Sequence, residues 1–182
     1  GSYSPHAHGR KNEHSSLFFS IMKAEPLTDF SRLCVHTITT KGWGLEEAVD
    51  HYAYAGVSGI TVWRQWLEGK EPSKAGERIR SAGLEVVSLC RGGFYPALKE
   101  TSREEALEDN KRAIEDAALL GAPLVVLVCG AVPGQSLVES RKQITDGIAA
   151  TLPLAESLGV KLAIEPLHPM YADDRSAINP LA

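Results

Sequence analysis

Apolar residues in this chain follow a repeated pattern, in which a segment with helical periodicity is followed by a glycine and then by a short apolar run. Gly56, Gly83, Gly121 and Gly159 each stand directly before such a run. A glycine just past a helix adopts the left-handed backbone conformation that ends many helices, because it has no Cβ to clash. The repeat is typical of βα units. It predicts strands at 33–37, 57–63, 84–89, 122–128 and 160–164.

The segments between these strands carry apolar residues three and four positions apart, as amphipathic helices do. The apolar faces comprise Leu45, Ala48, Val49 and Tyr52 in the first helix, Leu107, Ile114 and Ala117 in the third, and Ile144, Ile148, Leu152 and Ala155 in the fourth. Ser102 and Glu105 have the spacing of a capping box, so we expect Ser102 to cap the third helix. Pro153 is expected to kink the fourth helix or split it in two, because proline lacks the backbone N–H donor.

The strands, above all 124–128, are apolar at successive positions, which indicates that both faces of a parallel α/β sheet are covered. Two architectures fit this pattern. A doubly wound, flavodoxin-like sheet fits the length, but its first βα turn should bind phosphate, and residues 39–44 match neither GxGxxG nor a P-loop. An incomplete (β/α)8 TIM barrel fits the polar residues at the strand ends, although a whole barrel needs about 250 residues and this chain has 182.

Composition narrows the class of protein. A chain of 182 residues with 43% hydrophobic residues is expected to form one core, so we assign 1–30 to a tag remnant and arm and 31–182 to one partial-barrel domain. The net charge of −4 argues against a nucleic-acid partner, and no apolar run approaches the roughly 20 residues that cross a bilayer. Three widely spaced cysteines favour reduced thiols and a cytoplasmic location.

Glu165 is the sharpest candidate for chemistry. It follows an apolar strand directly, so its carboxylate is expected at the mouth of the fold, where it can hold a divalent cation or take a proton. A solvated or ion-paired carboxylate at a loop edge is an equally good interpretation of the spacing. His168 lies between Pro166 and Pro169, which restrict its direction. It is expected either to bind substrate hydroxyls or to be an exposed loop histidine.

Three further residues at strand ends are candidates for substrate binding. Arg91, followed by two glycines and Phe94, can close over an anionic or sugar-like ligand, or it can be solvated. Trp63 can pack on the face of a pyranose ring, although such residues more often fill the core. His36 belongs to the same mouth if the barrel interpretation holds. Cys90 is expected to be a small buried hydrophobic residue rather than a nucleophile.

Five phrases in the chain resemble a known family: 29–33, 39–41, 59–64, 88–94 and 164–171. They are similar to the sugar phosphate isomerase/epimerase family, which has a xylose-isomerase-like TIM barrel, and the likeness runs from about Asp29 to Asn179. The resemblance implies a divalent cation, Mn, Mg, Co or Zn, held by Glu, Asp, His and Glu at the ends of the fifth to eighth strands. Glu165 matches the first of these ligands. The other three ligands have no counterpart in this chain. We therefore expect the chain to be inactive alone, and one expectation is that it binds no metal.

The implied reaction is an enediolate-type proton transfer on a sugar or inositol derivative. The resemblance makes Glu165 and His168 the catalytic candidates, Glu165 the metal ligand, and His36, Trp63 and Arg91 the substrate-binding residues. Whether the chain is itself an enzyme stays open, because the alternative is a non-catalytic partial barrel. Its open sheet edges would then drive a homo-oligomer or a domain-swapped dimer. A DNA-repair endonuclease of the same superfamily is disfavoured by the net charge.

Overall fold

The computed structural model describes residues 26–168, 170 and 176–179, so residues 1–25 of the expected arm lie outside the described residues. Five strands alternate with helices along the chain. The elements are β1 (Cys34–His36), η1 (Thr37–Thr40), α2 (Leu45–Tyr54), β2 (Gly59–Trp63), η2 (Arg64–Leu67), α3 (Pro72–Ser81), β3 (Glu85–Gly93), α4 (Glu100–Leu120), β4 (Leu124–Val128), α5 (Leu137–Ser157) and β5 (Lys161–Ile164).

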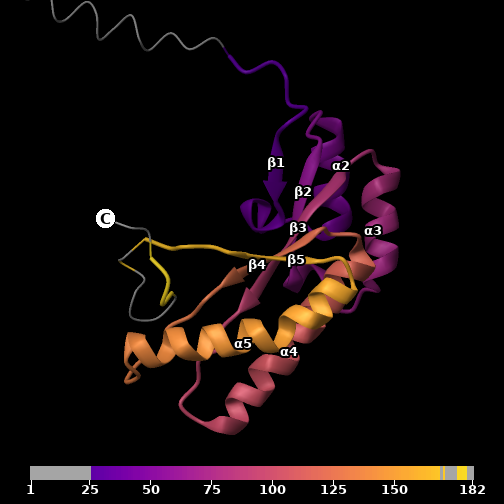
Figure 1. Ribbon diagram of the computed structural model, residues 1–182. Coiled ribbons are helices and arrows are strands. Elements are labelled where there is room, and N and C mark those ends of the chain that lie inside the picture. The colour runs from indigo at the N-terminus through magenta and orange to yellow at the C-terminus, as the bar shows by residue number, and fades with distance from the viewer. Residues whose placement is uncertain (1–25, 169, 171–175, 180–182) are drawn as a thin grey trace, which may run out of the picture.

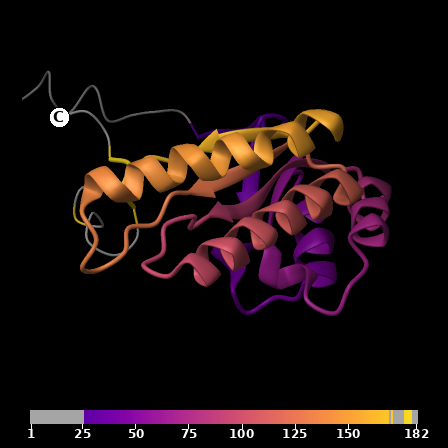
Figure 2. The same cartoon turned by 60° about the horizontal axis from the view of Figure 1, so that its bottom comes forward.

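The five strands form one parallel sheet in the order β1-β2-β3-β4-β5. Right-handed crossovers between strands in this order carry every connecting helix to the same side, and α2 to α5 all lie on one face of the sheet (Figures 1 and 2). A doubly wound sheet reverses its strand order and carries helices on both faces. The observed topology is that of a partial TIM barrel, which confirms the incomplete-barrel architecture and excludes the flavodoxin-like alternative.

The core lies between the sheet and its helices. The strands contribute Ile60, Val62, Leu89, Val125 and Leu127, none more than 1% exposed. The helices contribute Val49, Ile79, Ile114, Ala117 and Leu120, which are buried to the same degree. Burying one such aliphatic side chain stabilises the folded state by about 1.5–3 kcal/mol, so this layer is the main source of stability.

The opposite face of the sheet carries no helix of the described residues. Laterally paired residues on neighbouring strands point to the same side, and the register places two adjacent rows on this helix-free face. One row consists of His36, Thr61 and Ser88, and the other of Trp63, Cys90, Val126 and Ala163. Thr61, Ser88 and Cys90 on this face are nonetheless buried, whereas His36 is exposed. The expectation of two covered faces therefore holds for the helix side and for the middle strands of the opposite face.

Two local expectations about helices are corrected. Helix α4 begins at Glu100 with Lys99 as its N-cap residue, so Ser102 lies inside the first turn and does not cap the helix. Helix α5 is capped instead by Ser136, whose hydroxyl accepts from the Glu139 backbone N–H at 3.2 Å. It continues through Pro153 rather than splitting, because one missing N–H donor is a small loss beside the packing of Thr151 and Ala155, both fully buried.

Candidate active site at the strand ends

His36 and Trp63 meet at the carboxyl ends of two neighbouring strands. The indole Nε1–H of Trp63 donates to His36 Nδ1 at 3.3 Å. The buried Thr37 hydroxyl accepts from the Trp63 backbone N–H at 3.0 Å, which fixes the start of η2 relative to β1. A neutral imidazole whose Nδ1 accepts a hydrogen bond carries its proton on Nε2. Because His36 is exposed, that Nε2–H is a donor open to a ligand.

Glu165 lies at the end of β5. Its backbone N–H donates to the Leu127 carbonyl at 3.0 Å, so strand pairing extends one residue beyond Ile164, and its side chain is exposed. Burial raises the pKa of the Cys90 thiol to about 12, and the negative charge of Glu165 adds to this shift. The Glu165 carboxylate is therefore within electrostatic reach of Cys90, a residue in one of the two rows on the helix-free face.

His168 and Arg91 lie apart from this group. The His168 ring faces its own loop, because Nδ1 accepts from the Met170 backbone N–H at 3.2 Å. The exposed Arg91 guanidinium stacks over the Phe94 ring, 4.2 Å from its centroid. The structure thus brings His36 and Trp63 together and places Glu165 on the same face of the sheet. Within the described residues, neither His168 nor Arg91 forms a hydrogen bond or ion pair with these three residues.

The described residues contribute one candidate ligand to a metal site, not a complete set. No group of three or more His, Cys, Asp or Glu side chains within the described ranges is arranged to hold a metal ion. A catalytic divalent cation takes at least three protein donors in most enzymes, and Glu165 supplies one. These residues therefore do not by themselves fit a catalytic metal.

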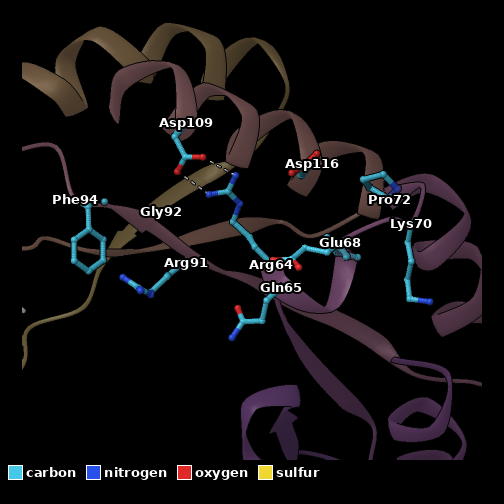
Figure 3. A pocket seen from close by; sticks show the side chains of 12 residues that line it. Arg64, Gln65, Glu68, Lys70, Pro72, Arg91, Gly92, Phe94, Asp109 and Asp116 are labelled. Atoms are coloured by element: carbon cyan, nitrogen blue, oxygen red, sulfur yellow. Dashed lines mark hydrogen bonds and ion pairs between the residues drawn. The ribbon is translucent and has the colours of Figure 1, made fainter. Parts of the chain in front are cut away.

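A cavity of about 630 Å³ opens beside the strand ends, between η2, the start of α3, the end of β3 and α4 (Figure 3). At its centre the Arg64 guanidinium forms a bidentate ion pair with the Asp109 carboxylate. Nη1 donates to Oδ2 at 2.8 Å and Nη2 donates to Oδ1 at 3.0 Å. This pairing lowers the pKa of Asp109 and raises that of Arg64. The sequence singled out neither residue as a site candidate, because Arg64 was only the last residue of the phrase 59–64 and Asp109 lies in a highly charged helix.

Asn110 holds the end of β3 in place. It is 2% exposed, and its side-chain oxygen accepts from the Gly93 backbone N–H at 2.7 Å. Its amide donates to the carbonyls of Gly93 at 2.7 Å and Ala106 at 2.8 Å. The sequence held a signal for this role: Asn110 stands between Leu107 and Ile114 on the apolar face of α4, where an unpaired polar group would be unfavourable.

Replacement of Asp109 by asparagine is expected to lower the free energy of unfolding by about 1 kcal/mol at neutral pH, since the ion pair is only half buried. The Arg64 guanidinium holds the pKa of Asp109 below its ordinary value of 3.8. A carboxyl group with a lowered folded-state pKa stabilises the protein above its unfolded-state pKa, and this contribution disappears as the pH falls through the folded-state pKa. Urea unfolding of both proteins at neutral pH and at about pH 3 should show the gap closing in acid. A gap that does not change with pH would contradict this role.

The cysteines are expected to differ in reactivity. Burial raises the pKa of Cys90 to about 12 and that of Cys129 to about 11, so almost no thiolate forms at either site near pH 8. Cys34 is half-buried. Treatment of the native chain with iodoacetamide should modify Cys34 alone, and unfolded chain should be modified at all three, as intact mass spectrometry can count. Rapid native labelling of Cys90 would show that the sheet end is open.

No helix in the described part of the chain is both long and apolar enough to span a membrane. Among curated protein sequences, none matches this chain. Among solved structures, protein SMc04130 from Sinorhizobium meliloti 1021 is 44% identical, with a TM-score of 0.75, over 80% of this chain and 54% of that chain. The present chain therefore spans about half the length of this relative.

Two more distant structures share the fold. The 3-keto-D-glucoside 4-epimerase YcjR from E. coli is 19% identical, with a TM-score of 0.61, over 73% of this chain and 53% of its own. The IOLI protein, with a bound zinc atom, is 22% identical, with a TM-score of 0.65, over 77% of this chain and 53% of its own. The family model of the xylose isomerase-like TIM barrel matches residues 49–178. This chain, with its five parallel strands in sequential order, belongs to the xylose isomerase-like TIM barrel family.

Proposed function

We propose that this chain forms the sugar-binding part of an isomerase or epimerase that moves a proton at the carbon next to a carbonyl of a sugar or inositol derivative. The observation that carries the proposal is the placement of the His36–Trp63 pair and Glu165 on the helix-free face, at the carboxyl ends of parallel strands. TIM-barrel enzymes have their active sites at that end. The neighbours with this fold include a sugar epimerase.

Each of the three residues has a proposed role. The Trp63 ring packs against the C–H face of a sugar ring, and the His36 Nε2–H donates to one of its hydroxyls. Glu165 supplies the carboxylate that takes the transferred proton, or that serves as one ligand of a divalent cation completed by donors outside the described residues. A catalytic role for His168 stays a prediction, since its Nδ1 is already engaged in its own loop.

Sugar binding can be tested on the chain as it is. Titration with D-fructose and myo-inositol, followed by calorimetry, should give an affinity that falls about tenfold in His36→Ala, the loss of one hydrogen bond to the ligand. The matched control is His51→Ala, because His51 is an exposed histidine on α2. Equal affinity in wild type and His36→Ala would remove His36 from the site.

The chemistry can be tested in a chimaera. We expect the part of protein SMc04130 that this chain does not cover, fused to residues 26–179, to supply the missing donors. Loss of the C–H proton signal of a ketose in heavy water, with the diamagnetic ion Mg²⁺ present, would report proton transfer by NMR. Glu165→Gln should abolish this exchange, while Glu156→Gln, an exposed control on α5, should leave it intact. Exchange that survives Glu165→Gln would contradict the proposal.

A second candidate, a non-catalytic partial barrel that self-associates, is favoured by the two unpaired sheet edges. Among the described strands β1 pairs only with β2, and β5 only with β4. Ile164 on β5 is 47% exposed. Size-exclusion chromatography with light scattering should then show a dimer that Ile164→Lys dissociates, whereas Leu119→Lys, at an exposed site on α4, should not. A monomeric wild type would argue against self-association.

A further inference from the structure

The cavity beside the strand ends is separate from the mouth of the fold, by which we mean the part of the helix-free face that carries His36, Trp63 and Glu165. Arg64 and Arg91 line the cavity, and they directly follow Trp63 and Cys90, whose side chains belong to the helix-free face. The cavity lies toward α3 and α4, which contribute Pro72, Asp109 and Asp116 to its lining, whereas the mouth lies on the helix-free face. Every lining residue falls between Arg64 and Asp116, in a continuously described part of the chain.

One wall of the cavity presents an acceptor without a partner. Asp116 lines it from α4 and is half-buried (Figure 3). Its carboxylate makes no hydrogen bond and no ion pair with a described residue, and burial raises its pKa. The neighbouring Asp109 differs, because both of its oxygens accept from Arg64. A half-buried carboxylate that faces a cavity is best satisfied by a ligand that donates hydrogen bonds.

The opposite side presents a donor without an acceptor. The Arg91 guanidinium stacks on Phe94 and makes no ion pair with a described residue. The other cations at the cavity are already paired: Arg64 with Asp109, and Lys70 Nζ with Glu46 at 3.7 Å. The Gln65 amide adds both a donor and an acceptor at the rim. Among the described residues, the cavity thus holds one unpaired cation, Arg91, and two unpaired carboxylates, the half-buried Asp116 and the exposed Glu68.

We infer that this cavity binds a neutral polyhydroxylated group, a sugar ring whose hydroxyls donate to Asp116 and accept from Arg91. A hydroxyl both donates and accepts, so one ring can satisfy both groups, whereas a phosphate would face the carboxylates of Asp109 and Asp116. A volume of about 630 Å³ lies within the range of small-molecule sites. The ring is either a free sugar or the second ring of a disaccharide whose first ring contacts His36 and Trp63. Only if the ligand is a disaccharide that spans both sites does this inference rest on the proposed function.

The test uses the 182-residue chain and neutral probes: D-glucose, D-fructose, myo-inositol and cellobiose, each titrated by saturation-transfer NMR. We expect saturable binding of at least one probe, weakened about tenfold in Asp116→Ala. Arg91→Ala should weaken it too. Glu115→Gln, an exposed carboxylate one position away on the same helix, is the matched control and should bind as wild type does. Circular dichroism of each variant separates loss of the ligand contact from loss of the fold.

His36→Ala distinguishes the two sources of the ring. A free sugar in the cavity should bind this variant with unchanged affinity, while a disaccharide that spans both sites should bind it more weakly, and either result supports the inference. Failure of the proposed proton transfer would leave binding that depends on Asp116 intact, so the two failures are distinguishable. Three results would overturn the inference: no probe binds, Asp116→Ala binds the probes as wild type does, or inorganic phosphate binds the cavity in preference to every neutral probe.

Discussion

Gly93→Ala is expected to lower the free energy of unfolding by about 4 kcal/mol. The Gly93 backbone has φ of 97°, in the region that disfavours a side chain. A Cβ built there would lie 2.1 Å from the Val128 carbonyl oxygen and 2.6 Å from its carbonyl carbon. These are backbone atoms of the adjacent strand, so β3 and β4 must separate to admit the methyl group. Urea unfolding followed by circular dichroism measures the loss.

Gly134→Ala is the matched control for this effect. Gly134 has a similar φ of 85°, but nothing lies within 4 Å of the position of its Cβ. The alanine there should cost only the backbone strain, about 1 kcal/mol. The difference between the two variants isolates the clash with Val128. Equal losses would mean that backbone conformation alone requires Gly93, and the close approach of the strands would play no part.

Asn110→Ala is expected to lower the free energy of unfolding by about 3 kcal/mol. The substitution removes the partners of the Gly93 N–H and C=O groups, which bond to Asn110 at 2.7 Å in both directions. Each buried backbone group left unpaired costs about 1–3 kcal/mol. Chemical denaturation is again the direct measurement. The same variant should also weaken sugar binding in the cavity, because Gly93 and Phe94 form part of its wall.

The control for Asn110→Ala is Gln135→Ala. Gln135 is half-buried in the segment before α5, and its amide makes one side-chain hydrogen bond, to the Ser140 hydroxyl at 3.3 Å. Truncation there should cost less than about 1 kcal/mol, since water can replace the lost partner. If the two variants are equally stable, the hydrogen bonds to Gly93 do not hold the end of β3.

The repeated units could be predicted because their signals are local. Each apolar run contains an observed strand or most of one, as Gly59–Trp63 does within 57–63. The glycines before the runs do have left-handed backbones, with φ of 74° at Gly56 and 84° at Gly121. Hydrophobic spacing and helix termination depend on neighbours a few residues away, so one sequence suffices to read them. Right-handed crossovers leave few topologies open, and of the two that the sequence allowed, the structure has the one with strands in sequential order.

The end of β3 could not be predicted from the same signals. The apolar run stops at Leu89, but the strand continues to Gly93 through an arginine and two glycines, a composition that usually indicates a loop. What makes this segment a strand is its pairing with β4 and the hydrogen bonds from Asn110, both contributed by distant residues. Tertiary contacts here override local preference.

The site was predictable in part for a related reason. His36 and Trp63 both followed apolar runs, and parallel strands bring such ends together, so their meeting follows from the topology. The Arg64–Asp109 ion pair joins a strand end to the middle of a helix, and no spacing rule connects the two. Asp116 was invisible for the same reason. Asp116 matters because no described neighbour forms a hydrogen bond or an ion pair with its carboxylate, and a sequence does not show which residues become neighbours.

All walls of the cavity come from two successive βα units, the stretch from Arg64 to Asp116. Because these units are adjacent in the sequence, only short loops have to close when the cavity forms. Its walls therefore come together early in folding, with a small loss of chain entropy. The location of the cavity within one block of sequence also has a consequence for evolution. A duplication or exchange of this one block would carry the whole cavity into another barrel with its lining intact, whatever chemistry the recipient performs at its centre.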